Sequence, residues 1–146
     1  MAALSDYLEN KLVDYVLRGQ AFTAPATVYV GLLTAAPSDT GGGTEVSGNA
    51  YARVAVTSSL ANWAGTQAAA STVASSGTGG TTSNNAVITF PTPTPAGWGV
   101  VTHFAVYDAA SAGNLLFYAA LTVSKTINVG DAVSFVAAAL SLQLDN

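Results

Sequence analysis

The chain has 146 residues, of which half are hydrophobic and only 8% are charged. An ordinary globular domain carries about 25% charged residues, so the shortage of charge is the most unusual property of this sequence. Four Lys and Arg residues against eight acids give a net charge of −4. Such a chain cannot neutralise many phosphates or hold a basic membrane patch, so we expect no nucleic-acid partner and no membrane partner.

The length fits a single domain over residues 1–146. The sequence has no cysteine, which excludes disulfides, thiolate zinc sites and iron–sulfur clusters, and its single histidine is too few for a multi-histidine metal site. Charged residues interrupt every apolar run in residues 1–20, so we expect no cleavable signal and synthesis in a cytoplasm. No transmembrane helix is predicted.

Residues 4–18 carry the clearest helical pattern. Apolar side chains recur there at spacings of three and four and form one stripe: Leu4, Leu8, Leu12, Tyr15 and Val16. Ser5 or Asp6 can cap the start of the helix, and Gly19 can end it. An isolated helix of this length is marginal in water, so the stripe must pack on its own domain or on another chain. The short link after Gly19 favours its own domain.

Residues 26–144 predict β-structure. Five segments are short, rich in β-branched and aromatic residues, and bounded by turn formers: 26–33, 51–58, 86–90, 100–107 and 114–121. We further expect a short strand at 123–128, a long one within 132–144, and long loops at 36–49 and 64–85. The pattern predicts a mainly β fold, namely an antiparallel β-sandwich or barrel-like domain with one N-terminal amphipathic α-helix.

Candidate catalytic residues are scarce. His103 lies inside a predicted strand, and no serine stands in a nucleophile-elbow pattern. Asp39 and Glu45 flank the glycine triplet 41–43, but two acids at this spacing do not make a calcium loop. We therefore expect no catalytic residue, no metal, no cofactor and no enzymatic activity.

Two tryptophans, Trp63 and Trp98, lie among predicted loop residues. An exposed indole ring could stack on a carbohydrate or contact a partner. A tryptophan in a small domain more often closes one end of the core, and we favour that interpretation.

A long stretch without charged residues is the main indication that the chain assembles with other copies. Residues 54–107 contain no Asp, Glu, Lys or Arg. Monomers usually keep charges interspersed on their surface for solubility, whereas a neutral surface is easier to bury against a neighbour. This predicts a homo-oligomer, and we expect a trimer in particular.

Several separated segments agree in order with one known group of proteins: 4–10 (LSDYLEN), 21–31 (AFTAPATVYVG), 51–57 (YARVAVT), 98–108 (WGVVTHFAVYD), 113–118 (GNLLFY) and 124–131 (SKTINVGD). The chain resembles small virion structural proteins of tailed bacteriophages, which are often described as tail-fibre or structural proteins. The resemblance covers most of the chain except residues 64–85. It implies a location in the virion, other virion proteins as partners, and no enzymatic residues.

Size, β-rich character and neutral surface suit many identical copies bound on a lattice. We therefore expect a capsid cement or decoration protein that stabilises the head through contacts with the major capsid protein. A tail or tail-fibre component bound to tail proteins is the first alternative. A glycan-binding module that uses Trp63 or Trp98 is the second.

Overall fold

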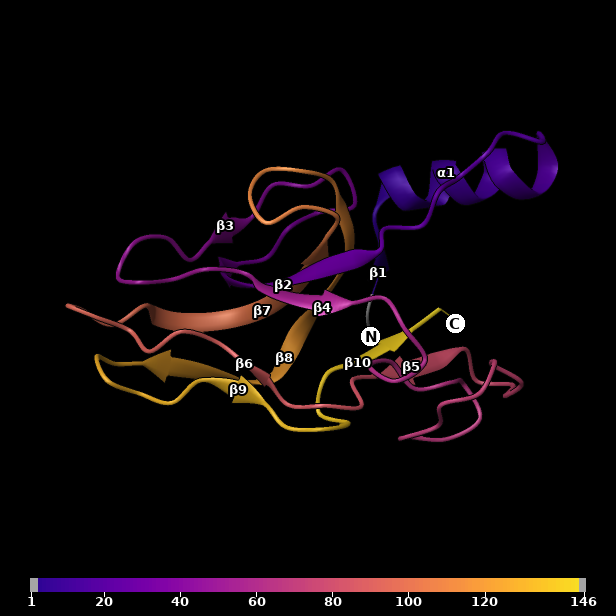
Figure 1. Cartoon of the computed structure of the whole chain (residues 1–146). Coiled ribbons are helices and arrows are strands. Elements are labelled where there is room, and N and C mark those ends of the chain that lie inside the picture. The colour runs from indigo at the N-terminus through magenta and orange to yellow at the C-terminus, as the bar shows by residue number, and fades with distance from the viewer. Residues whose placement is uncertain (1–2, 145–146) are drawn as a thin grey trace.

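The computed structural model describes residues 3–144 and is built mainly from antiparallel strands (Figure 1). This confirms the predicted mainly β class with an N-terminal helix. The elements in chain order are β1 (Ala3–Leu4), α1 (Asp6–Leu17), β2 (Thr27–Ala35), β3 (Thr44–Glu45), β4 (Val54–Thr57), β5 (Thr81–Ser83), β6 (Ile88–Thr89), β7 (Gly99–Tyr107), β8 (Leu115–Ile127), β9 (Ser134–Phe135) and β10 (Ser141–Gln143). No helix among residues 3–144 is long and apolar enough to span a membrane.

The larger layer is a six-stranded antiparallel sheet in the order β1-β8-β7-β2-β3, with β4 also paired to β2. Its centre is the long antiparallel pair β7 and β8, joined by the hairpin loop at 108–114. Two small sheets, β6–β9 and β10–β5, form a second layer beneath it (Figure 1). Within residues 3–144 the large sheet stays open at both edges, so the fold is layered and not a closed cylinder.

The main core fills the space between the two layers, and it follows the period of two that strands impose. Val30 and Leu32 of β2 point into this core, while the neighbouring Leu33 joins a smaller cluster on the other face of the sheet. We call this other face the outer face. Its apolar cluster contains Leu33, Ala105, Tyr107 and Leu115, with Tyr29 and Tyr118 beside them.

Asn84 organises the second layer from a buried position. Its side chain is 1% exposed, and its Oδ1 accepts from the backbone N–H of Leu140 at 2.9 Å. Its Nδ2 donates to the carbonyls of Ala86 at 2.8 Å and Val136 at 2.9 Å. These bonds supply partners for backbone groups that lie outside regular strands, which is why irregular chain can be buried here.

The helix is shorter than the predicted 4–18. Leu4 belongs to β1, where it pairs with Phe117 of β8, and Ser5 is the N-cap of α1. The Ser5 side chain accepts from the backbone N–H of Leu8 at 3.3 Å, so the capping serine moves the helix start past Leu4.

The β-rich region also differs in detail from the prediction. The expected strands at 114–121 and 123–128 form one strand, β8, and the expected long strand within 132–144 is split into β9 and β10. Between them Ala138 adopts a positive φ of 65°, which interrupts an extended chain. The expected loops at 36–49 and 64–85 contain the short strands β3 and β5.

Candidate functional site

The predicted apolar stripe of the helix does not act as one unit. Leu8 is buried at 7% exposure and packs into the main core. Leu12, Tyr15 and Val16 are 39%, 58% and 69% exposed. The expected packing of the stripe on its own domain therefore holds for Leu8 and Leu4 but not for the other three residues, because the helix leaves the body after its first turns (Figure 1). Leu4 packs against the core from β1.

The last half of the helix is apolar and exposed. Five residues, which we call the helix tip, are all at least 39% exposed: Leu12, Val13, Tyr15, Val16 and Leu17. Nη1 of Arg18 lies 3.3 Å from Oδ1 of Asp14, and this ion pair neutralises both charges beside the helix tip. The tip thus presents an almost neutral apolar surface at the end of an element that projects from the body.

The base of the helix is held firmly. The backbone N–H of Ser5 donates to the carbonyl of Leu116 at 3.0 Å, and the Ser5 hydroxyl donates to the carbonyl of Leu115. The N–H of Asp6 donates to the carbonyl of Asp39 at 2.9 Å. The helix start is therefore bonded both to β8 and to the loop at 36–43.

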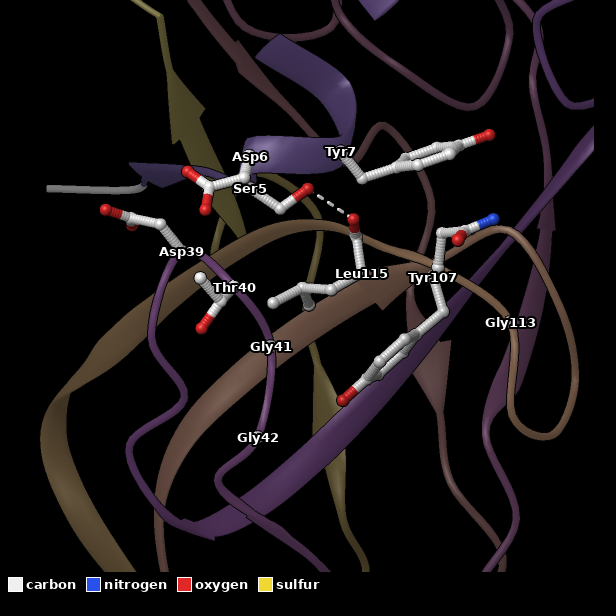
Figure 2. Close-up of a pocket in the computed structure, with 11 residues that line it drawn as sticks. Ser5, Asp6, Tyr7, Asp39, Thr40, Gly41, Gly42, Tyr107, Gly113 and Leu115 are labelled. Carbon is white, nitrogen blue, oxygen red and sulfur yellow. Dashed lines mark hydrogen bonds between the residues drawn. The ribbon is translucent and has the colours of Figure 1, made fainter. Parts of the chain in front are cut away.

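A polar pocket lies between this helix start and the outer face of the sheet (Figure 2). Its volume is about 330 Å³. Its walls come from three parts of the chain that are distant in sequence: Ser5, Asp6 and Tyr7; Asp39, Thr40, Gly41 and Gly42; and Tyr107, Gly113, Asn114 and Leu115. We call it the base pocket.

Tyr118 braces the loop on one side of this pocket. Its hydroxyl donates a hydrogen bond to Oδ1 of Asp39. This bond, with smaller contributions from burial and from the negative charge of Asp39, raises the pKa of Tyr118 from 10.0 to about 12. Asp39, in the loop before the glycine triplet, is thus tied to β8 through this hydrogen bond.

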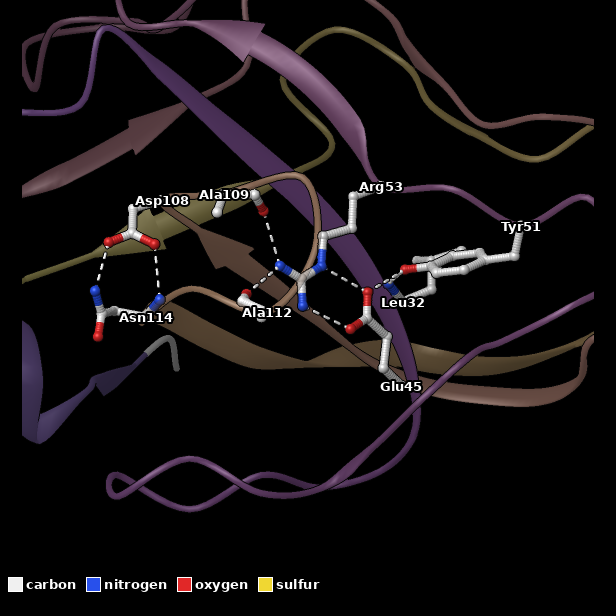
Figure 3. A network of polar contacts seen from close by, with 8 residues as sticks. All are labelled: Leu32, Glu45, Tyr51, Arg53, Asp108, Ala109, Ala112 and Asn114. Atoms are coloured by element: carbon white, nitrogen blue, oxygen red, sulfur yellow. Dashed lines mark hydrogen bonds and ion pairs between the residues drawn. The ribbon is translucent and has the colours of Figure 1, made fainter.

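On the same outer face of the sheet, the side chain of Arg53 is the centre of a network of polar contacts (Figure 3). The guanidinium makes a bidentate pair with Glu45, at 2.8 Å from Nε to Oε1 and 2.7 Å from Nη2 to Oε2. Its Nη1 donates to the carbonyls of Ala109 and Ala112, both at 2.8 Å, and its carbon Cζ lies 3.4 Å from the ring centroid of Tyr107. The Arg53 side chain is only 7% exposed.

The network reaches into the sheet through Tyr51. The Tyr51 hydroxyl donates to Glu45 at 2.8 Å and accepts from the backbone N–H of Leu32 at 2.9 Å. Burial raises the pKa of Tyr51, and the charge of Glu45 adds to the effect. Burial alone would lower the pKa of Arg53, but hydrogen bonds and charge from Glu45 reverse the sign, so its net shift is upward.

Gly31 of β2 gives this network its space. A Cβ atom at this position would lie 2.9 Å from Glu45 Oε1, 3.1 Å from the Tyr51 hydroxyl and 3.2 Å from Cε2 of Tyr107. Glycine therefore allows the charged pair to lie over a central strand.

The two tryptophans have different surroundings. Trp98 is 7% exposed, donates from Nε1 to the carbonyl of Asn49 at 3.0 Å, and meets the ring of Tyr51 edge-on at 5.3 Å between centroids. Trp63 is half-buried and lines an apolar pocket of about 210 Å³ with Val28 and Phe117. Neither tryptophan borders the base pocket.

His103 lies in β7, where its Nδ1 is 2.8 Å from the hydroxyl of Thr102. The sequence did not single out Arg53 or Tyr107 as site residues, although both side chains are central to the contacts on the outer face. One signal could have identified Arg53: it is the single basic residue between Arg18 and Lys125 and opens an apolar strand. A lone charge in such a segment requires a partner if it is buried.

Replacing Arg53 by Met should lower the free energy of unfolding by about 3 kcal/mol, because Glu45 then keeps a partly buried charge without its partner. Replacing Glu45 by Leu in the same chain should restore part of this loss. Urea unfolding of both variants and the wild type measures the effect. Equal stabilities for the wild type and Arg53→Met would contradict the proposed importance of the pair.

The raised pKa of Tyr118 predicts a loss of stability in alkali. The folded protein holds the phenolic proton more tightly than the unfolded chain, so the contribution is complete below pH 10 and disappears as the pH rises from 10 to about 12. In the Tyr118→Phe variant, stability should fall less steeply over this range. Unfolding free energies measured at a series of pH values test this, and parallel curves for the two proteins would refute it.

A comparison with curated proteins found no significant match. A scan against protein families matched residues 3–143, nearly the whole chain, to the family described as podophage GP4 fiber I protein gp80. The match confirms the resemblance to tailed-phage virion structural proteins. The chain is therefore a phage structural protein and belongs to the family of the podophage GP4 fiber I protein gp80.

Proposed function

We propose that this chain is a structural subunit of a tail fibre and has no enzymatic activity. The description of its family refers to a fibre, which favours the tail-fibre alternative of the sequence analysis over the capsid cement role. The cement role stays a prediction without support from the family. The charge-free stretch at residues 54–107 suits either location, because both place the chain against other virion proteins.

The helix tip is the observation that supports assembly most directly. Fully burying an aliphatic side chain contributes about 1.5–3 kcal/mol, so an exposed group of five apolar residues favours a partner surface. Leu12 and Tyr15 continue from Leu8 at spacings of four and three, which is the seam along which helices pack side by side.

We assign other copies of this chain as the partner of the tip. Asp14 and Arg18 neutralise each other within one copy of the chain, so the partner surface needs no opposite charge to pair with them. An almost neutral apolar surface is best matched by an identical one, and helices from neighbouring copies would then form a small bundle. A trimer is the arrangement that we expect.

Replacing Leu12 and Val16 by Asp should abolish self-association while the β-rich body stays folded, because both side chains are exposed in the isolated chain. Sedimentation reports the oligomeric state, and circular dichroism with thermal unfolding reports the fold. Incorporation of the variant into phage particles should be lost as well.

The matched control places two Asp residues elsewhere on the surface. Val87 and Val129 are each 57% exposed and lie outside the helix. Their double replacement by Asp adds the same charge and should leave self-association unchanged. If the tip variant assembles like the wild type, or if both variants fail equally, the helix is not the assembly surface.

Immunogold electron microscopy of phage particles tests the location. An antibody against the whole chain should label the tail, at a small number of positions for each particle. Labelling spread over the capsid in many copies would reject the fibre proposal and support the cement role.

A further inference from the structure

We propose that the base pocket binds a neutral saccharide. The pocket is lined by the first residues of α1 and by Tyr107 and Leu115 of the outer face, and no residue of the helix tip lines it (Figure 2). At about 330 Å³ it falls within the range of roughly 300–1,000 Å³ for small-ligand sites. This inference goes beyond the structural role proposed above and does not depend on it.

Tyr107 is the residue that points to a ligand. Its side chain is buried at 8% exposure, with Arg53 stacked on its ring. Its hydroxyl has no hydrogen-bond partner among residues 3–144, yet the residue lines the base pocket. Figure 2 shows this hydroxyl directed to the side of the Gly41–Gly42 loop. A phenol that is mostly buried, lines this pocket and has no protein partner for its hydroxyl in the described residues is ready to bond a molecule in the pocket.

The acidic side chains of the pocket indicate which charged groups the bound molecule can carry. The carboxylate of Asp6 makes no hydrogen bond within residues 3–144, and Tyr118 occupies only Oδ1 of Asp39. Lys11 lies 5.7 Å from the ring centroid of Tyr7 but does not line the pocket. A site with two acids, and with no cation among the residues of 3–144 that line it, disfavours phosphate, sulfate and acidic sugars.

The donors of the pocket argue against a simple cation. The hydroxyls of Tyr107 and Thr40 line the same space, and the backbone of Gly41 and Gly42 approaches it without side chains. Sugar hydroxyls both donate and accept, so they can donate to the carboxylates and accept from these groups at once. The ring of Tyr7 adds an aromatic wall on which the apolar C–H face of a sugar can pack (Figure 2).

These residues differ from those of the earlier glycan-binding alternative. That hypothesis relied on Trp63 and Trp98, but Trp98 is buried in an aromatic cluster and neither lines the base pocket. The saccharide site is assigned to a tyrosine pair and two acids, which come together only in the folded chain.

The test uses the whole chain and an array of oligosaccharides that carries neutral, sialylated and amino-sugar members. Neutral members should bind. The best of them, added to isotope-labelled protein, should shift NMR signals of residues 39–42 and of the Tyr107 region. The Tyr107→Phe variant removes only one hydroxyl and should weaken this binding about tenfold, the loss expected for one good hydrogen bond. Asp6→Asn should weaken it by a similar factor.

The matched control is Tyr29→Phe. Tyr29 pairs with Tyr107 in the neighbouring strand but does not line the pocket, so its loss of a hydroxyl should leave the affinity unchanged. Thermal unfolding confirms that each variant is folded. No binding of neutral members, tighter binding of sialylated or amino-sugar members, or equal affinity of Tyr107→Phe and wild type would each overturn the proposal. Particles that carry Tyr107→Phe should still contain the protein, which separates this result from the assembly test.

Discussion

The arrangement of loops and side chains on the outer face depends on the ion pair between Arg53 and Glu45. It connects β3, the segment before β4 and the hairpin between β7 and β8, which are separate in sequence and lie across the central strand β2. A buried pair adds little stability relative to an apolar replacement, but it tolerates few other arrangements because every donor needs its acceptor. In a chain with so little charge, this pair fixes geometry where apolar packing alone would allow several.

Tyr107 connects that network to the base pocket. One part of its ring carries the guanidinium of Arg53, and its hydroxyl end reaches the pocket. The hydroxyl is protonated at neutral pH, and burial raises the pKa of Tyr107 above its ordinary value of 10.0, so it also remains a donor in mildly alkaline solution. The position of this donor is therefore set by the same contacts that hold the hairpin in place.

Patterns with a regular period were predictable, and irregular structure was not. The alternation in β2 and β7 and the helical spacing after Ser5 follow from backbone geometry, so the mainly β class and the helix could be inferred. The strand expected at 132–144 fails because Asn84, more than fifty residues earlier, bonds to this segment and holds it in a turn. The base pocket is lined by residues from three segments, 5–7, 39–42 and 107–115. No pattern in the sequence indicates that these segments lie together in the folded chain.

The firm base of α1 makes the helix a lever. Twelve helical residues at about 1.5 Å each place its last turn roughly 18 Å from the hydrogen bonds at Ser5 and Asp6. A small rotation at the base is magnified over that length, so those few bonds determine the angle between helix and body. If the tip packs in a bundle of identical helices, the angle sets the direction in which every base pocket faces around the bundle axis.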